Sequence, residues 1–264
     1  MPNRNYPNRI AQRLSLSPKQ VASVLNLLDG GNTVPFIARY RKEMTGSLDE
    51  LKLREVSTEY TRLQKVDDRR DTVRESIAEQ GALTPELESA IEAADSVTEL
   101  DDLYQPYKRK RRTRATVAQE RGLTPLADLM QSQPTDRKSP DEHARLFLSD
   151  EVPTVEDALA GARDILAERM SDNPDIRRQV REKAMQFGSL VVSKVKNADD
   201  PKSVYASYYD YTNRVSRIRP HQTLAINRGE SEKVLRVKLE LEERDWLRPM
   251  QNAFRTDSRS PFRE

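Results

Sequence analysis

A hydroxyl or amide side chain followed directly by proline recurs along the chain, and this dipeptide is typical of the first turn of an α-helix. The examples are Ser17-Pro18, Thr84-Pro85, Thr124-Pro125, Ser139-Pro140 and Asn173-Pro174. The first side chain can accept a hydrogen bond from an N–H group of the new helix, and proline lacks the N–H that would otherwise stay unpaired there. These repeated helix starts predict a chain built mainly from helices.

The composition agrees with a mainly α fold. Charged residues make up 33 % of the 264 residues, aromatic residues 6 %, and there are only 8 glycines. All-β folds need more turns and more β-branched or aromatic strands, so the composition favours helices with narrow apolar faces. We expect helices near 18–29, 33–40, 48–80, 85–94, 97–104, 114–121, 125–132, 140–148, 155–170, 174–187 and 221–228.

Individual helix ends and two strands can also be predicted. Ser47 with Glu50 predicts a capping box for the helix 48–80, and Gly229 is expected to end the helix 221–228. The β-branched run 190–195 and the alternating run 234–241 predict a small β element near the C-terminus. We predict two domains, a helical one at 1–196 and a helix-plus-strand segment at 197–264.

Several classes of site are excluded by residue type. The chain has no cysteine and only two histidines, His143 and His221, so neither a thiolate metal site nor a histidine-rich centre can form. His221 is expected to cap or pack at a helix start. We see no nucleophile–base pair, and therefore predict no enzyme, no catalytic residue, no metal and no cofactor. No apolar run is long enough to cross a membrane and no secretory signal is visible, so a cytoplasmic location is expected.

The net charge of +2 hides an uneven distribution. The stretch 84–102 contains seven acids and no base, and the next stretch contains a dense basic run. We predict that this run contacts nucleic-acid phosphates, with Tyr104 and Tyr107 close enough to stack on bases; its cations are Lys108, Arg109, Lys110, Arg111, Arg112 and Arg114. Two alternatives remain open, which are pairing with the acids at 86–102 and a solvated charged surface.

A second candidate lies in the segment VPFIARY and the residues after it. Arg39 and Arg41 could contact the same ligand, while Phe36 is expected to point inward. Pairing of these arginines with Glu43 or Asp49 is an equal alternative. The turn Gly30-Gly31-Asn32 before this segment resembles the turn of a helix-turn-helix. Farther on, the stretch 212–228 holds four arginines and no acid. Four tyrosines at 205–211 and Trp246 could form a stacking platform, but their spacing fits an aromatic core or an interdomain seam better.

Three blocks of sequence resemble the bacterial Tex family, the transcription accessory proteins. They are VPFIARYRKEMTGSLDE at 34–50, LYQPYKRKRRTRATVAQERGLTPLADLM at 103–130 and ASYYDYTNRVSRIRPHQTLAINRGESEKVLRV at 206–237. The family is also similar to the core of a eukaryotic transcription elongation factor. Its members continue into RNase-H-like, helix-hairpin-helix and RNA-binding OB-fold domains, so we expect this chain to be the N-terminal region alone, as a fragment or a shortened relative.

The resemblance implies a multi-helix N-terminal Tex-like region with helix-turn-helix-like packing and a role associated with transcription. We predict a non-catalytic nucleic-acid-binding and scaffolding region that contacts RNA or DNA mainly through the backbone, with little sequence specificity. The alternative is a protein–protein docking module for the transcription or translation machinery, with RNA polymerase or ribosome-associated proteins as partners.

Overall fold

The structure is a computed structural model that describes residues 4–108 and 111–263. It divides into two compact units, Met1–Tyr104 and Gln105–Glu264, and each is described by itself. Helices dominate both units, and the small β element lies in the second, which confirms the mainly α prediction. In the described part of the chain, no helix is long and apolar enough to cross a membrane.

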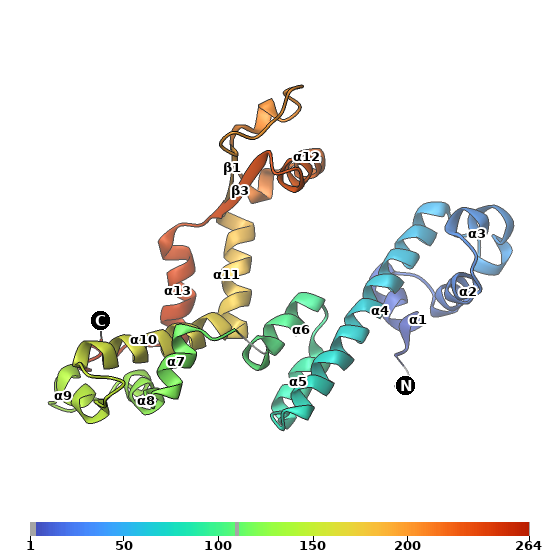
Figure 1. Cartoon of the computed structure of the whole chain (residues 1–264). Coiled ribbons are helices and arrows are strands. Elements are labelled where there is room, and N and C mark those ends of the chain that lie inside the picture. Colours follow the sequence, from blue (N-terminus) through green and yellow to red (C-terminus); the bar gives the residue numbers. More distant parts are fainter. Residues whose placement is uncertain (1–3, 109–110, 264) are drawn as a thin grey trace. The chain divides into compact units, whose positions relative to one another are not determined.

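The first unit is entirely helical in its described part and is organised around one long helix (Figure 1). Its helices are α1 (Tyr6–Leu14), α2 (Pro18–Asp29), α3 (Val34–Tyr40), α4 (Glu50–Glu79), α5 (Pro85–Ala93) and α6 (Val97–Tyr104). Apolar side chains of α1, α2 and α3 pack on the N-terminal half of α4, around Leu53, Val56 and Leu63. α5 and α6 pack against the C-terminal half of α4.

Most helices of the first unit begin and end where the sequence predicts, but two details differ. α1 was not predicted, although Tyr6, Ile10 and Leu14 follow a four-residue spacing that places them on one face. The predicted capping box of the long helix is wrong. Asp49 is the N-cap, and its carboxylate accepts a hydrogen bond from the backbone N of Lys52 at 2.7 Å, while Ser47 has a φ of 61°.

The second unit combines a helical bundle with a three-stranded sheet (Figure 1). Its helices are α7 (Arg114–Glu120), α8 (Thr124–Ser132), α9 (Pro140–Ala144), α10 (Val155–Asp172), α11 (Pro174–Phe187), α12 (Pro220–Ser231) and α13 (Glu243–Ala253). α7, α8 and α9 pack on α10 around Leu126 and Ile165, which are fully buried. α11 packs against α13.

The sheet has the strand order β2-β1-β3, and both pairings are antiparallel. Its strands are β1 (Ser189–Lys194), β2 (Asp210–Arg214) and β3 (Leu235–Glu240). Val192 of β1 lies opposite Tyr211 and Val237, and α12 covers this apolar face. The pairing of β1 with β2 and β3 links residues on both sides of position 196. The domain boundary expected there remains a prediction.

Two predictions about α12 are wrong. Gly229 does not end the helix, because it lies inside α12, where a Cβ atom would come within 2.6 Å of Leu235 Cδ1. Glycine is therefore needed for the close approach of α12 to β3. His221 neither caps nor packs, since it is exposed, and the side chain of Gln222 instead accepts the hydrogen bond from Arg219 N at 3.0 Å.

The tyrosines at 205–211 belong to an apolar cluster, which agrees with the aromatic core among the predicted alternatives. Tyr205 is 4 % exposed, and its hydroxyl donates to Glu232 Oε2 at 2.8 Å. Asp200 accepts hydrogen bonds from Tyr205 N at 3.0 Å and from the Tyr209 hydroxyl at 2.7 Å. These donors, led by the Tyr205 backbone N–H, lower the pKa of Asp200. The hydroxyls of Tyr205 and Tyr209 are engaged internally, and the rings of Tyr208 and Tyr211 pack on each other with centroids 5.4 Å apart, which favours the aromatic core over a stacking platform.

Candidate nucleic-acid interface

The described cations of the predicted basic run lie just before α7 and in its first turn. Lys108 follows the short 3₁₀ turn Gln105–Tyr107, Arg111 and Arg112 precede the helix, and Arg114 is its first residue. All four side chains are exposed. Tyr107 is half-buried. Arg109 and Lys110 lie outside the described residues.

Thr113 fixes the beginning of α7 relative to α10. Its Oγ1 accepts a hydrogen bond from Thr116 N at 3.0 Å, which caps the helix, and donates to Glu168 Oε1 of α10 at 3.0 Å. Farther along, a Cβ atom at Gly161 of α10 would lie 2.4 Å from Leu123 Cδ1 and 3.2 Å from Ala118 Cβ. The glycine therefore allows the two helices to approach closely.

The surface between α7 and α10 is hollowed, and three arginines line the hollow. Its volume is about 430 Å³, and its lining includes Arg112, Arg114 and Arg121 together with Asp157 and Asp164. Arg121 follows Arg114 by seven residues, two turns later on the same helical face. Arg121 was not predicted as a site residue, although its spacing from Arg114 could have indicated it.

The cations of this interface differ in whether an acid neutralises them. Arg112 pairs with Glu120 at 2.7 Å and Arg114 with Asp164 at 3.2 Å, and both arginines are well exposed. Within the described ranges, Lys108, Arg111 and Arg121 have no carboxylate partner. We call these five residues the α7 cations. Exposed ion pairs stabilise a fold by only about 0–1 kcal/mol, so a phosphate can replace the carboxylates of Arg112 and Arg114 at small cost.

Three acids of the stretch 84–102, Glu92, Asp95 and Asp101, pair with arginines of the first unit. Asp101 pairs with Arg69 at 2.6 Å, and Glu92 pairs with Arg74 at 3.3 Å. Tyr104 is also engaged there, because its hydroxyl lies 2.9 Å from Ser76 Oγ and its ring lies under the Arg69 guanidinium. These contacts leave fewer acids for the alternative in which 86–102 neutralises the basic run.

The second candidate, around α3, differs from its prediction. Ile37 is fully buried, but Phe36 is 37 % exposed and Tyr40 is 63 % exposed, so Phe36 does not point inward. Their ring centroids are 5.1 Å apart, and the Arg41 guanidinium lies over the Phe36 ring at 5.5 Å. In the region that the structure covers, neither Arg39 nor Arg41 pairs with Glu43 or Asp49, so that alternative is wrong.

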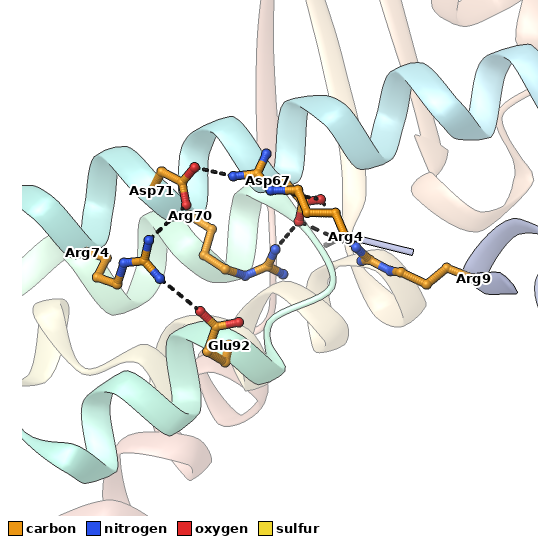
Figure 2. Close-up of a pocket in the computed structure, with 7 residues that line it drawn as sticks. All are labelled: Arg4, Arg9, Asp67, Arg70, Asp71, Arg74 and Glu92. Carbon is orange, nitrogen blue, oxygen red and sulfur yellow. Dashed lines mark hydrogen bonds and ion pairs between the residues drawn. The ribbon is translucent and has the colours of Figure 1, made fainter. Parts of the chain in front are cut away.

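A pocket on the first unit has a structural rather than a binding character (Figure 2). Four arginines and three carboxylates line a volume of about 330 Å³. Figure 2 shows Arg74 placed between Asp71 and Glu92, at 3.2 and 3.3 Å. Asp67 is 1 % exposed and contacts Arg9 at 3.3 Å and also Arg70. Every cation in this pocket already has a carboxylate partner, so the arginines hold α1, α4 and α5 together.

Comparison with known proteins gives two family matches. Residues 4–78 match the family described as "Tex-like protein N-terminal domain", and residues 135–260 match "Tex central region-like". The α7 cations lie between these two matched ranges.

Similar proteins occur in bacteria and in humans. The chain is 38 % identical to the "Transcriptional accessory protein Tex" of Neisseria gonorrhoeae over 242 residues, which cover 91 % of this chain and 32 % of the relative. It is 40 % identical to "Protein tex" of Bordetella pertussis over 236 residues, 89 % of this chain and 30 % of that protein. The human "S1 RNA-binding domain-containing protein 1" is 29 % identical over 88 % of this chain and 24 % of its own length. The chain thus spans about a third of the length of the bacterial relatives.

Proposed function

The chain belongs to the Tex family of transcription accessory proteins, and on that basis we propose that it is a nucleic-acid-binding and scaffolding region with no catalytic role. The observation that carries this proposal is the set of α7 cations. Five exposed cations lie on a short stretch of chain, three of them without a carboxylate partner among the residues described. Binding of such a surface to a nucleic-acid backbone is favourable because it releases the counterions condensed on the phosphates.

Arginine is the main residue of this surface, and its chemistry fits phosphate. The planar guanidinium can donate two parallel hydrogen bonds to phosphate oxygens, which lysine cannot do. Arg112, Arg114 and Arg121 line one hollow, so a backbone that enters it meets several forks in succession. Contacts of this kind position a nucleic acid without reading its sequence. We therefore expect RNA and DNA single strands to bind with little sequence preference.

The absence of a catalytic role is part of the proposal. His143 is 5 % exposed, donates from Nε2 to Asp136 Oδ1 at 3.0 Å and packs on Phe262. His221 is exposed at the start of α12. Neither lies in a nucleophile–base arrangement among the described side chains. A nuclease assay with Mg²⁺ or Mn²⁺ checks this part of the proposal, and metal-dependent cleavage would overturn it.

Charge reversal tests the binding proposal. We expect Arg111→Glu with Arg121→Glu to weaken the binding of both a labelled single-stranded RNA and a labelled single-stranded DNA by tenfold or more in fluorescence anisotropy. Lys196→Glu with Lys202→Glu is the matched control, because it changes the net charge equally at exposed lysines without described acid partners. Equal weakening by the two double variants would show only a dependence on net charge and would reject the α7 cations as the interface.

The exposed aromatic pair of α3 favours a second candidate function, docking to a protein of the transcription or translation machinery. Phe36, Tyr40 and Met44 are all more than a third exposed, and Arg41 lies on the Phe36 ring. Aromatic, methionine and arginine side chains are enriched at protein interfaces. Tyr40→Ala should then reduce binding to purified RNA polymerase or ribosomes and leave RNA affinity unchanged. A loss of RNA affinity instead would assign α3 to the nucleic-acid surface.

A further inference from the structure

A second basic hollow lies in the unit 105–264, where the segment 254–263 packs on the loop between α8 and α9. Its volume is about 450 Å³. Two cations come from the loop, Arg137 and Lys138, and two come from the segment, Arg259 and Arg263. More than a hundred residues separate the two pairs in the sequence, so only the fold brings them together.

The segment is fastened to the bundle by specific contacts. The Gln133 side chain donates from Nε2 to the Phe262 carbonyl oxygen at 3.1 Å and accepts at Oε1 from Asp257 N at 3.2 Å. Phe262 is 8 % exposed, and its ring centroid lies 5.5 Å from that of His143. Ser260 is 2 % exposed. These contacts give the segment a fixed position, so its cations have fixed neighbours in the loop.

Two carboxylates, Asp136 and Glu142, also line this hollow, and both are engaged in local hydrogen bonds. Glu142 accepts from Ser139 N at 2.7 Å, and this backbone bond lowers the pKa of the Glu142 carboxyl. Asp136 Oδ1 accepts from His143 Nε2 at 3.0 Å and from Lys138 N at 3.2 Å. Asp257, just outside the hollow, pairs with Arg259 at 2.8 Å.

Three cations of the hollow remain without an acid partner. In the described part of the chain, neither Arg137 nor Lys138 pairs with a carboxylate, and the Arg263 guanidinium donates to the Ser258 carbonyl oxygen at 3.3 Å rather than to an acid. Three serines, Ser139, Ser258 and Ser260, also line the hollow. Guanidinium and ammonium groups combined with hydroxyl donors are the chemistry that holds a tetrahedral oxyanion.

We propose that this hollow binds a phosphate group. Arg137 and Lys138 supply the charge, and the docked segment closes the opposite side with Arg263 and Ser258. The group is either free phosphate or a phosphodiester of a nucleic-acid backbone. The proposal does not depend on binding by the α7 cations, because it rests on different residues.

A titration with inorganic phosphate tests the proposal. In a phosphate-free buffer at constant ionic strength, amide NMR signals of Lys138, Ser258 and Ser260 should shift and saturate. Arg137→Ala with Lys138→Ala should raise the apparent Kd at least tenfold, and Lys196→Ala with Lys202→Ala should leave it unchanged. Shifts that rise linearly, as they would with chloride, or equal Kd values in both double variants would overturn the proposal.

A second arm distinguishes the two sources of phosphate. A base-free phosphodiester oligomer should compete with inorganic phosphate if the hollow takes a nucleic-acid backbone, and should fail to compete if it takes the free ion. Arg111→Glu with Arg121→Glu should leave phosphate binding at this hollow intact. Failure of the proposal here and failure of the proposed function are therefore separate results.

A variant that removes no charge tests whether the docked segment builds the site. Phe262→Ala should release the segment from His143 and weaken phosphate binding at least fivefold, with an unchanged far-UV circular dichroism spectrum. Unchanged affinity in this variant would show that Arg137 and Lys138 bind alone, and would overturn the part of the proposal that assigns the segment to the site.

Discussion

Arg70 of α4 donates a hydrogen bond from Nη2 to the carbonyl oxygen of Ala94 at 2.7 Å, at the C-terminal end of α5. The same guanidinium donates from Nε to the carbonyl oxygen of Ile91 at 3.1 Å and also contacts Asp67. Carbonyl groups at a helix C-terminus lack partners within the helix and carry partial negative charge, so a cation stabilises them. α5 is thus attached to α4 by buried charge as well as by apolar packing.

Replacing Asp67 should destabilise the first unit strongly. Asp67→Asn removes the acid that neutralises Arg9 and Arg70, and breaking a buried ion pair costs about 3–5 kcal/mol. Native-state hydrogen exchange of the buried α4 amides measures this loss. Asp68→Asn is the control, since Asp68 is 80 % exposed and should change the stability by less than about 0.5 kcal/mol. Similar losses in the two variants would contradict a structural role of the network.

A methyl group at position 161 should disturb the packing of α7 on α10. Gly161→Ala adds a Cβ atom 2.4 Å from Leu123 Cδ1, and overpacking of this kind costs about 1–3 kcal/mol. Alanine favours a helix over glycine by about 1 kcal/mol, which offsets part of this cost. A net stabilisation would indicate that α7 and α10 separate easily at this position. Urea unfolding of the variant measures the balance. Leu123→Val in the Gly161→Ala background should recover part of the stability.

The carboxyl group of Asp257 should titrate far below its ordinary range. Hydrogen bonds from the Arg259 side chain and from its backbone N–H lower the pKa of Asp257 from 3.8 to about 2. Because the folded pKa is depressed, this stabilisation is complete above the unfolded pKa and is lost as the pH falls from about 4 through about 2. Carbon NMR of the Asp257 carboxyl should give a midpoint of about 2, and Arg259→Ala should move it toward 3.8. A midpoint near 3.8 in the unchanged protein would show that the pair does not form.

Amide hydrogen exchange should be slower in α4 than at the end of β3. Leu53, Val56, Val73 and Ile77 of α4 are fully buried, whereas Leu239 of β3 is 55 % exposed. β3 is also an edge strand, which pairs with β1 alone among the described strands. Because protection follows burial, amides of 238–240 should exchange faster than those of 53–77. Equal protection would mean that the apolar face of β3 is fully covered in this chain.

The helices were predictable from the sequence because short local motifs, an N-cap side chain often followed by proline, mark where they begin. Thr84 and Thr154 accept hydrogen bonds from the third residue of their helices, as their spacing predicts. β2 and α13 carry weaker signals and were missed. β2 has only Tyr211 and Asn213 on its half-buried face, and α13 contains Pro249 inside the helix, which normally argues against one.

The location of the candidate interface could be predicted from the sequence, but the ion pairs of its arginines could not. Charge density alone pointed to 108–114, yet only the structure shows that Arg114 meets Asp164 and that Arg121 lines the same hollow. The burial of charged side chains in α4 could not be predicted from the sequence either. Asp67 and Arg70 interrupt the apolar stripe of α4 and look like solvent-facing residues. They pair with each other within α4, but their further partners, Arg9 and the Ala94 carbonyl, lie in α1 and at the end of α5 and are distant in the sequence.

The salt dependence of single-stranded RNA binding tests the central claim most directly. If four of the α7 cations contact phosphates, the slope of log affinity against log salt concentration should be near about −3, from about 0.7 per contact. Arg111→Ala with Arg121→Ala should flatten the slope by about 1.4 for the two lost contacts, and Lys196→Ala with Lys202→Ala should leave it unchanged. A slope near zero, or one that the Arg111 and Arg121 substitutions do not alter, would contradict a phosphate-binding role for the α7 cations.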